Sequence, residues 1–333
     1  MENIQNILTK YIYPMLPPHI AQLLMKLPVK LLANVTEIRI RINQPLLLVT
    51  GNQDIMVADA GQETNPSQAY RSTRQDLLRI FQVMCKNSVY AFEPELQQGY
   101  LTITGGHRVG LAGQAAVIDG TVKTLTHISS LNIRLARSIP DCAKPILPFV
   151  IDRINKRIYN ALLISPPRCG KTTILRDLIR QLSNGNVDLG ISGVQIGLVD
   201  ERSEIAACEN GIPSIDLGPR VDVLDACPKA KGLLMLIRSM APEVVATDEI
   251  GRAEDVAAIQ EAIHAGVSVI TTVHSRTIHD LYERPYIGEL VKHKTFDRYI
   301  ILSNRLGPGT IEEIYNANHE KIHIYSNEVK VCG

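Results

Sequence analysis

A loop at residues 165–173, SPPRCGKTT, lies between an apolar run at 161–164 and a segment at 172–182 that carries aliphatic residues at helical spacing. A strand, a tight loop and a helix that begins with Gly-Lys-Thr are the setting of a Walker A phosphate loop. Free backbone N–H groups at such a helix start bind phosphate oxygens, and the helix dipole adds positive potential there. The loop therefore predicts a nucleotide site.

Individual residues of this loop have expected roles. Lys171 would reach the β- and γ-phosphates of a nucleotide, and the Thr172 hydroxyl would bind Mg²⁺. The motif G-x-x-x-x-G-K-[ST] has Ser165 in place of its first glycine, and Arg168 stands where many relatives also have glycine. A side chain at a position that requires positive φ is strained by about 1–3 kcal/mol. The alternative is a chance Gly-Lys-Thr at a helix start, which the neighbouring strand ends disfavour. The predicted nucleotide-binding residues are Ser165, Arg168, Cys169, Gly170, Lys171, Thr172 and Thr173.

Two adjacent carboxylates, Asp248 and Glu249, follow the short apolar run at 244–246. Downstream of a phosphate loop, Asp248 would hold Mg²⁺ through water, and Glu249 would orient or deprotonate the attacking water. In isolation the pair fits a helix N-cap followed by a first-turn acid equally well. The two residues are therefore candidates for metal binding and hydrolysis.

A second acidic segment, DERSE at 200–204, ends the apolar run at 194–199. Glu204 or Glu201 could activate water there, with Arg202 balancing the charge. A solvated loop with a salt bridge is the alternative.

His274 ends the apolar run at 267–273, where it could contact the γ-phosphate side of a nucleotide. A lone histidine is more often structural, and its position alone favours a functional role. Ligands of open α/β sheets collect beyond the carboxyl ends of the strands. We therefore expect the four strand ends, after residues 164, 199, 247 and 273, to form one site.

An arginine from a neighbouring subunit can accelerate phosphoryl transfer by roughly 10³–10⁵. The sequence does not rank the candidates, and a surface or ion-pair role fits each of them equally well. They are Arg134, Arg137, Arg220, Arg238 and Arg252.

The elements that must position these residues fall into two predicted domains. After about residue 158, apolar runs alternate with helical segments, which is typical of an α/β domain with a parallel sheet. Before about residue 140, an alternating strand at 36–42, a second strand at 46–49, a helix at 74–84 and two strands around Gly105-Gly106 predict a smaller α+β domain. Three prolines at 140, 145 and 148 mark the boundary, which gives domains 1–140 and 141–333.

Composition restricts the partners. The net charge is +1, and the chain has 11 Tyr, 4 Phe and no Trp, so nucleic acid is not expected as a direct partner. The six cysteines show no C-x-x-C pair or zinc spacing, which favours a reduced, cytoplasmic location. The sequence shows no signal peptide, and prolines and charges interrupt the early apolar segment at 11–35, so no transmembrane segment is expected.

Several motifs resemble known families. Residues 237–250 and 271–274 resemble the Walker B and His-box regions of type II/type IV secretion and pilus-motor ATPases, and 200–204 would match their Asp box. Gly251 stands where secretion ATPases carry an arginine. More closely, residues 90–95, 99–113, 199–205 and 216–231 resemble the stage III sporulation protein AA family of endospore-forming bacteria, and the similarity runs over nearly the whole chain.

The resemblance implies a RecA-like P-loop ATPase that uses ATP and Mg²⁺ and works as a homo-oligomeric, hexameric motor. It would lie in the mother-cell cytoplasm, associated with the membrane through membrane-embedded sporulation channel proteins. Carried over by position, nucleotide binding falls on Lys171 and Thr172, Walker B on Asp248 and Glu249, the Asp box on Glu204 and the His box on His274. Arginines that reach a neighbour's γ-phosphate would map to Arg134 or Arg137.

Two other functions fit the same motifs. An ATP-gated scaffold would bind nucleotide to order partner proteins and hardly hydrolyse it, which the altered phosphate loop favours. A RecA-like nucleic-acid motor is the other alternative, and the near-zero net charge disfavours it.

Overall fold

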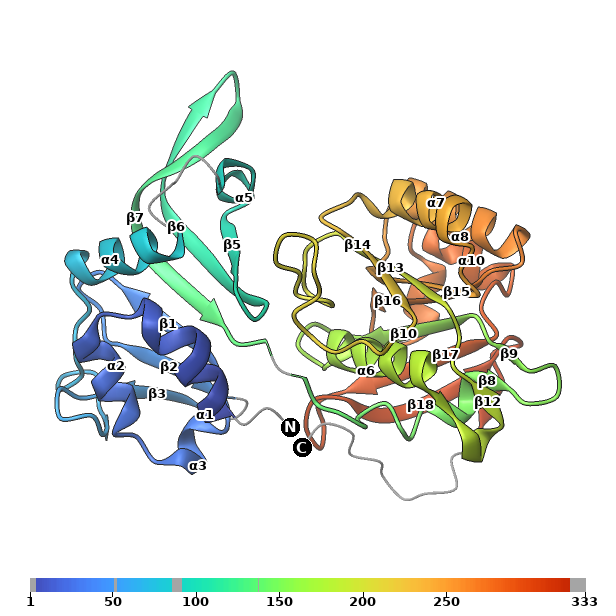
Figure 1. Ribbon diagram of the computed structural model, residues 1–333, viewed down its shortest axis with the longest axis horizontal. Helices are drawn as coiled ribbons and strands as arrows, with labels where there is room; N and C mark the ends of the chain where they lie inside the picture. The colour runs from blue at the N-terminus through green and yellow to red at the C-terminus, as the bar shows by residue number, and fades with distance from the viewer. Residues whose placement is uncertain (1–3, 51–52, 86–91, 137, 324–333) are drawn as a thin grey trace. The chain divides into compact units, whose positions relative to one another are not determined.

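The computed structural model describes residues 4–50, 53–85, 92–136 and 138–323 (Figure 1). The chain divides into two compact units, Met1–Arg137 and Ser138–Gly333. The described residues of the first unit form one hydrophobic core, and those of the second unit form two.

The first unit contains a seven-stranded antiparallel sheet in the order β4-β3-β2-β1-β7-β6-β5. The strands are β1 (Val35–Arg41), β2 (Leu47–Thr50), β3 (Asp54–Val57), β4 (Glu63–Thr64), β5 (Tyr100–Ile103), β6 (His107–Ile118) and β7 (Thr121–Arg134). The predicted hairpin of β1 with β2 and the predicted pair β5 with β6 are confirmed.

Helices complete the core of this unit. Ile38 and Ile40 of β1 are fully buried in it, as the alternating pattern predicts. The N-terminal helices are short because prolines interrupt them, whereas α4 begins at a capping box formed by Thr73 and Asp76. The helices are α1 (Ile4–Ile7), η1 (Leu8–Ile12), η2 (Tyr13–Met15), α2 (Pro18–Met25), α3 (Val29–Leu32), α4 (Arg74–Met84) and α5 (Glu93–Gln97).

Two features of the first unit differ from the expectation of a plain half-exposed sheet. Glu37 is buried, because Arg39 Nη2 and Asn132 Nδ2 donate hydrogen bonds to its carboxylate at 2.7 and 3.2 Å. The strands β6 and β7 form one long hairpin that projects from the sheet (Figure 1). Its Asp119-Gly120 turn has positive φ at both residues, the geometry that matches the twist of paired strands.

The second unit confirms the predicted parallel α/β architecture. Its eight-stranded sheet has the order β14-β13-β15-β16-β10-β17-β18-β19, parallel from β14 to β17 and antiparallel at the last two strands. The strands are β10 (Ala161–Ser165), β13 (Ile196–Asp200), β14 (Val221–Asp225), β15 (Val244–Glu249), β16 (Ser268–His274), β17 (Arg298–Ser303), β18 (Thr310–Asn316) and β19 (Lys321–Ile322).

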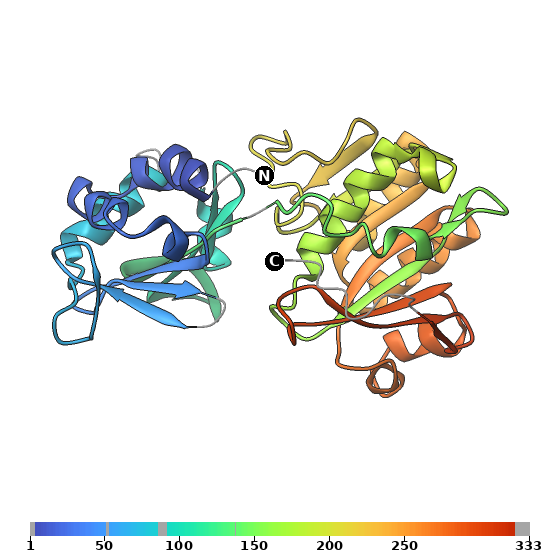
Figure 2. The ribbon, with the colours of Figure 1, turned by 90° about the horizontal axis from the view of Figure 1, so that it is seen from below.

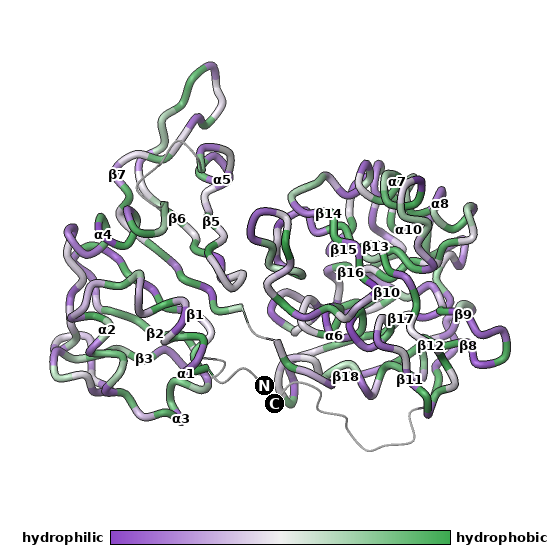
Figure 3. Tube along the Cα trace, in the orientation of Figure 1, coloured by the Kyte–Doolittle hydropathy of each residue, from purple (hydrophilic) through white to green (hydrophobic). Residues whose placement is uncertain are grey.

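Helices cover both faces of this sheet (Figure 2), and the hydropathy trace shows apolar residues along its strands (Figure 3). Leu163 of β10 packs in the core with α6, while Leu162 and Ile164 pack in the core on the opposite face. The first face is covered by α6 (Lys171–Asn184) and η4 (Leu147–Phe149), and the second by α7 (Lys229–Met240), α8 (Ala253–His264), α9 (His279–Tyr282) and α10 (Ile287–Lys292). Small peripheral elements are β8 (Ile151–Asp152), β9 (Arg157–Ile158), β11 (Gly185–Asn186), η5 (Val187–Leu189) and β12 (Ile191–Ser192).

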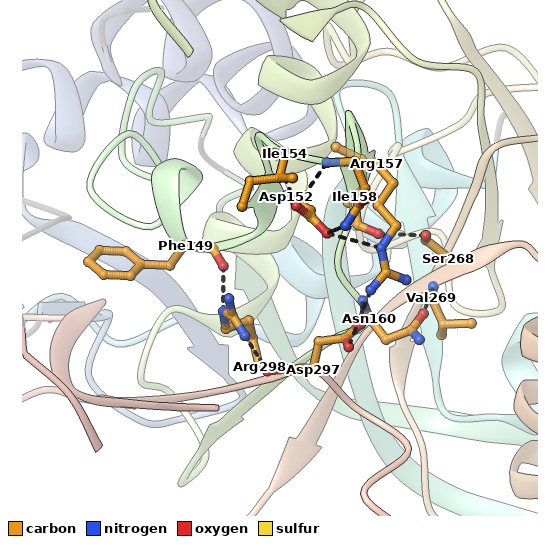
Figure 4. A network of polar contacts seen from close by, with 11 residues as sticks. Phe149, Asp152, Ile154, Arg157, Ile158, Asn160, Ser268, Val269, Asp297 and Arg298 are labelled. Atoms are coloured by element: carbon orange, nitrogen blue, oxygen red, sulfur yellow. Dashed lines mark hydrogen bonds and ion pairs between the residues drawn. The ribbon is translucent and has the colours of Figure 1, made fainter. Parts of the chain in front are cut away.

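A polar network fixes the amino ends of the central strands (Figure 4). Asn160 Oδ1 accepts from the N–H of Val269 at 2.9 Å, and the Asn160 N–H donates to Asp297 Oδ2 at 2.9 Å. Arg298 Nε donates to the Phe149 carbonyl at 2.9 Å. These contacts hold β10, β16 and β17 in register, which sets the positions of their opposite ends. None of the helices that the structure describes is long and apolar enough to cross a bilayer.

Candidate nucleotide site

The residues that could bind ligands or catalyse a reaction lie along the carboxyl edge of the second unit's sheet. β13, β15, β16 and β10 are consecutive neighbours in the sheet and run parallel, so their ends lie on one side. Ser165 and His274 are register partners at the ends of β10 and β16. Asp200 ends β13, and Asp248 and Glu249 end β15. The structure therefore places all four predicted strand ends on a single edge.

The phosphate loop turns into α6 at Gly170, which has a left-handed backbone with φ +82°. A Cβ atom at this position would lie 3.0 Å from the backbone nitrogen of Gly309. That nitrogen donates a hydrogen bond of 2.9 Å to the Cys169 carbonyl, so the turn between β17 and β18 backs the loop closely. Only glycine allows both the left-handed backbone and the close approach of Gly309 without strain.

The two departures from the Walker A pattern have different consequences. Arg168 has φ +63° and therefore carries the strain of a left-handed side chain. Ser165 lies in β10 and is not among the described residues with positive φ, so replacing the first glycine by serine strains nothing. The Ser165 hydroxyl lies 3.0 Å from Lys171 Nζ.

Lys171 is held inside the loop. Its Nζ donates to the carbonyls of Ser165 and Pro166 at 2.8 and 3.2 Å and lies 2.6 Å from His274 Nδ1. Burial lowers the pKa of Lys171 to about 8, although the charge of Glu249 opposes this shift. At neutral pH the ammonium is thus mainly protonated and has donors only.

His274 connects Lys171 to Glu249. Because the Lys171 ammonium can only donate, His274 Nδ1 accepts, and the ring proton lies on Nε2. His274 Nε2 is 3.1 Å from Glu249 Oε2. One contact chain, Lys171–His274–Glu249, therefore joins three of the residues selected from the sequence.

Asp248 is buried, and Lys229 is its ion-pair partner. Lys229 Nζ is 3.2 Å from Asp248 Oδ1 and 3.0 Å from Glu201 Oε2. Burial raises the pKa of Asp248 to about 6, and the Lys229 charge opposes it. Burial would lower the pKa of Lys229, but the two carboxylates outweigh it and the pKa is raised.

The residues present fit a Mg²⁺ ion. Mg²⁺ is usually held by one or two carboxylates together with substrate phosphates and water, without an all-protein cage. In the described part of the chain no group of three or more His, Cys, Asp or Glu could hold a metal ion by itself. Asp248 Oδ1 is buried and accepts no well-aligned hydrogen bond there, although Lys229 Nζ lies 3.2 Å away as its ion-pair partner. Thr172 lies in the first turn of α6, as the motif requires.

The acidic segment at 200–204 is organised around Asp200. Its fully buried carboxylate accepts the N–H groups of Glu204, Ile205 and Ala206 at 2.9, 2.9 and 2.8 Å. Burial raises the pKa of Asp200 to about 6, and these hydrogen bonds oppose the shift. Arg176 of α6 donates to the carbonyls of Glu204 and Ile205, each at 2.6 Å. The segment is therefore anchored to the phosphate-loop helix by its backbone.

The structure identifies two anchors that sequence reasoning missed, Asp200 as a backbone acceptor and Lys229 as a counter-ion. For Lys229 a signal existed. It is the first residue of α7, directly after Pro228, where the helix dipole disfavours a cation. A lysine at that position is stabilised when negative charge lies nearby.

The candidate arginines lie in different surroundings. Arg134 ends β7 in the first unit, with Nε 3.7 Å from Glu37 Oε1. Arg137 lies outside the described residues. Arg220 donates to the Ser183 carbonyl at 2.8 Å, Arg238 pairs with Glu261 at 3.3 Å, and Arg252 precedes α8.

An open depression of about 450 Å³ adjoins the phosphate loop. Arg284 Nη1 donates to the His274 carbonyl at 2.6 Å and so ties the wall of this depression to β16. Two arginines beside a phosphate loop favour anionic groups. The lining residues are Pro166, Pro167, His274, Ser275, Arg276, Asp280 and Arg284.

Comparison with known proteins places this chain in a family. Residues 8–322 match the family described as Sporulation stage III, protein AA. The chain belongs to this family. Stage III sporulation protein AA of Bacillus subtilis (strain 168) is 46% identical over 317 residues, which cover 95% of this chain and 98% of that relative. The resemblance noted from the motifs is confirmed.

Solved structures share the fold of this family member. The ATPase DotB of Legionella pneumophila has a TM-score of 0.53 at 16% identity and covers 80% of this chain and 72% of its own. The pilus retraction motor PilT with bound ADP has a TM-score of 0.53 at 14% identity, covering 80% and 74%. The predicted RecA-like P-loop fold is confirmed by these neighbours.

Proposed function

We propose that this sporulation protein binds Mg·ATP on the loop at 165–173 and hydrolyses it as a motor. The observation that carries the proposal is the contact chain from Lys171 through His274 to Glu249, which begins at the helix start after Gly170. It links a phosphate-binding lysine with a carboxylate suited to position water. The fold shared with the ATPase DotB and the pilus retraction motor PilT supports it.

Each residue then has a defined task. The amides leading into α6 and the Lys171 ammonium bind the phosphate oxygens. Thr172 and Asp248 hold Mg²⁺, which when bound neutralises charge on the phosphates. Glu249 orients the attacking water, and His274 fixes the Glu249 carboxylate by its Nε2 proton. Glu204 is proposed as a second acid that acts on this water.

Two substitutions test the activity. Lys171→Ala removes the phosphate contact, so nucleotide binding should be lost. Glu249→Gln leaves the loop intact, so binding should persist while phosphate release falls by about 10²–10⁴. Lys231→Ala and Glu283→Gln, which change exposed residues of the same unit, serve as matched controls. Hydrolysis that survives both site changes would refute the proposed activity.

We further propose that the active form is a homo-oligomer, a hexamer, in which Arg134 or Arg137 enters the site of a neighbouring subunit. The DotB and PilT neighbours support a motor of this type through their shared fold. Hydrolysis would move the first unit against the second in each subunit. The proposed location is the mother-cell cytoplasm, with membrane-embedded channel proteins of sporulation as partners.

A specific observation favours a second function, an ATP-gated scaffold with little turnover. Lys171 already bonds to two carbonyls, a hydroxyl and His274, and His274 also binds Glu249. Lys171 and Glu249, the two groups that hydrolysis would need, are thus both held through His274. Tight nucleotide binding without phosphate release, with Mg²⁺ and partners present, would favour the scaffold over the motor.

A further inference from the structure

Lys229 is an unusual residue of the candidate site because it is a buried cation at the N-terminal end of a helix, where a positive charge is unfavourable. Its side chain is 8% exposed, and it opens α7, where the helix dipole is positive. A buried ammonium at such a place is stable only when carboxylates compensate it. The compensating groups are Asp248 and Glu201, at 3.2 and 3.0 Å.

The neighbouring acid Asp200 does not share this lysine. Its two carboxylate oxygens accept three backbone N–H groups, from Glu204, Ile205 and Ala206. Asp248 Oδ1, in contrast, accepts no well-aligned hydrogen bond in the described structure and faces Lys229. Lys229 therefore occupies the carboxylate that the proposed function assigns to Mg²⁺.

We propose that Lys229 is a resident counter-ion that competes with the divalent cation for Asp248 and retains Glu201 when the cation binds. The inference rests on the proposed function, since it takes Asp248 as the carboxylate that faces Mg²⁺. A lysine can exchange partners in this way because its four-carbon stem is flexible and its three donors are equivalent. Since Glu201 is within reach of the same ammonium, the exchange leaves no unpaired buried cation.

The competition has a direct consequence for cation affinity. Without nucleotide, a divalent cation must displace Lys229 from Asp248, so its affinity is low. A neutral residue at position 229 removes the competing ammonium and leaves the carboxylates of Asp248 and Glu201 without this ion pair. The affinity for a divalent cation should then rise by about tenfold or more, the range over which one nearby charge shifts a carboxylate equilibrium.

The experiment is a titration of Mn²⁺ into the nucleotide-free full chain, followed by the electron paramagnetic resonance signal of free Mn²⁺. Lys229→Met and Lys229→Gln should each bind Mn²⁺ about tenfold or more tightly than the unchanged chain. Lys229→Arg keeps the charge and should bind Mn²⁺ weakly. Lys231→Met, which changes an exposed lysine of the same helix, should bind like the unchanged chain.

Each other outcome contradicts the proposal. If Lys229 only holds Asp248 in place, Lys229→Met binds Mn²⁺ more weakly, and Lys229→Gln, which still donates a hydrogen bond, restores the original affinity. Equal Mn²⁺ affinity in all variants shows that Lys229 does not compete with the cation and overturns the proposal. If thermal unfolding shows that neither neutral variant folds, the ammonium is an obligatory part of the structure and is not displaceable, which also overturns it.

Failure of the proposed function is distinguishable from failure of this inference. Binding of a fluorescent ATP analogue in EDTA depends on Lys171 and the loop and not on the cation at Asp248. Absent binding of the analogue by the unchanged chain both in EDTA and with Mg²⁺ refutes the proposed function, while the Mn²⁺ titration, which contains no nucleotide, reports on Lys229 alone.

Discussion

The substitution Gly170→Ala tests whether the turn between β17 and β18 fixes the phosphate loop. Gly170 has φ +82°, and a Cβ atom would lie 3.0 Å from Gly309 N and 3.3 Å from the carbonyl carbon of Pro308. Gly266 has a similar φ of +79° but nothing within 4 Å of its Cβ position. Comparing Gly170→Ala with Gly266→Ala therefore separates the cost of backbone strain from the cost of the steric contact with Gly309.

The expected magnitudes follow from this comparison. A left-handed backbone costs an alanine roughly 1–2 kcal/mol at either position. The gain from a stiffer unfolded chain, about 0.4–1 kcal/mol, is common to both substitutions. At Gly170 the contact adds about 1–3 kcal/mol of overpacking, because Gly309 cannot retreat without weakening its 2.9 Å bond to Cys169. Gly170→Ala should thus cost about 1–3 kcal/mol more than Gly266→Ala.

The assay is hydrogen exchange followed by mass spectrometry, with the opening free energy of α6 amides as the readout. Peptides from α6 report on the second unit separately from the first. Nucleotide affinity, measured on the same proteins, should fall for Gly170→Ala only. Equal opening free energies for the two variants would show that Gly309 yields to a side chain, and the account of the loop would be wrong.

Two further predictions concern the first unit. Mixing unchanged chains with Arg134→Ala chains should lower phosphate release more than dilution does if the arginine acts in a neighbour's site, as proposed; a strictly proportional loss contradicts a shared site. Burial favours the neutral form of Asp76, but hydrogen bonds from Tyr70 and Thr73 and the charge of His19 outweigh it and hold the pKa of Asp76 below its usual value. The stabilisation is therefore present above about pH 4 and is lost as the pH falls through the lowered pKa. Hydrogen exchange of α4 measured at falling pH should show no loss of stability from this source in Asp76→Asn. An unchanged pH dependence in that variant would mean that another group causes it.

The strand ends of the site could be predicted because local pattern and topology agree there. Apolar runs before Ser165, Asp248 and His274 are too short for helices and alternate with helical segments, which dictates parallel strands. Parallel strands place their carboxyl ends on one edge, so residues far apart in sequence meet without any knowledge of side-chain contacts.

The contacts that sequence reasoning missed depend on long-range register. Lys229 meets Asp248 only because α7 packs beside β15, and Asp200 turns inward because three later N–H groups converge on it. Glu37 has an alternating, outward-facing position in its strand, yet cross-strand partners bury it. The long β6–β7 hairpin had a local signal, the Asp119-Gly120 turn, flanked by strand-forming residues.

Backbone conformation limits what residue type alone can indicate. Ser165 and Arg168 both depart from the glycine pattern, but only Arg168 has a positive φ. The phosphate loop tolerates one departure without strain and carries the other at a cost of roughly 1–2 kcal/mol. The proposed role of an arginine between subunits depends on how copies of the chain assemble, which local sequence patterns do not encode.

The hydrogen bond from Gly309 to Cys169 gives the rim of the sheet a direct mechanical path to the loop at 165–173. Gly309 immediately precedes β18, and β18 and β19 form the outer margin of the sheet. Tension applied to that margin reaches the loop through one amide without first deforming the central strands. In a motor built on this chain, load on the rim and the residence time of the spent nucleotide would therefore be coupled within a single subunit.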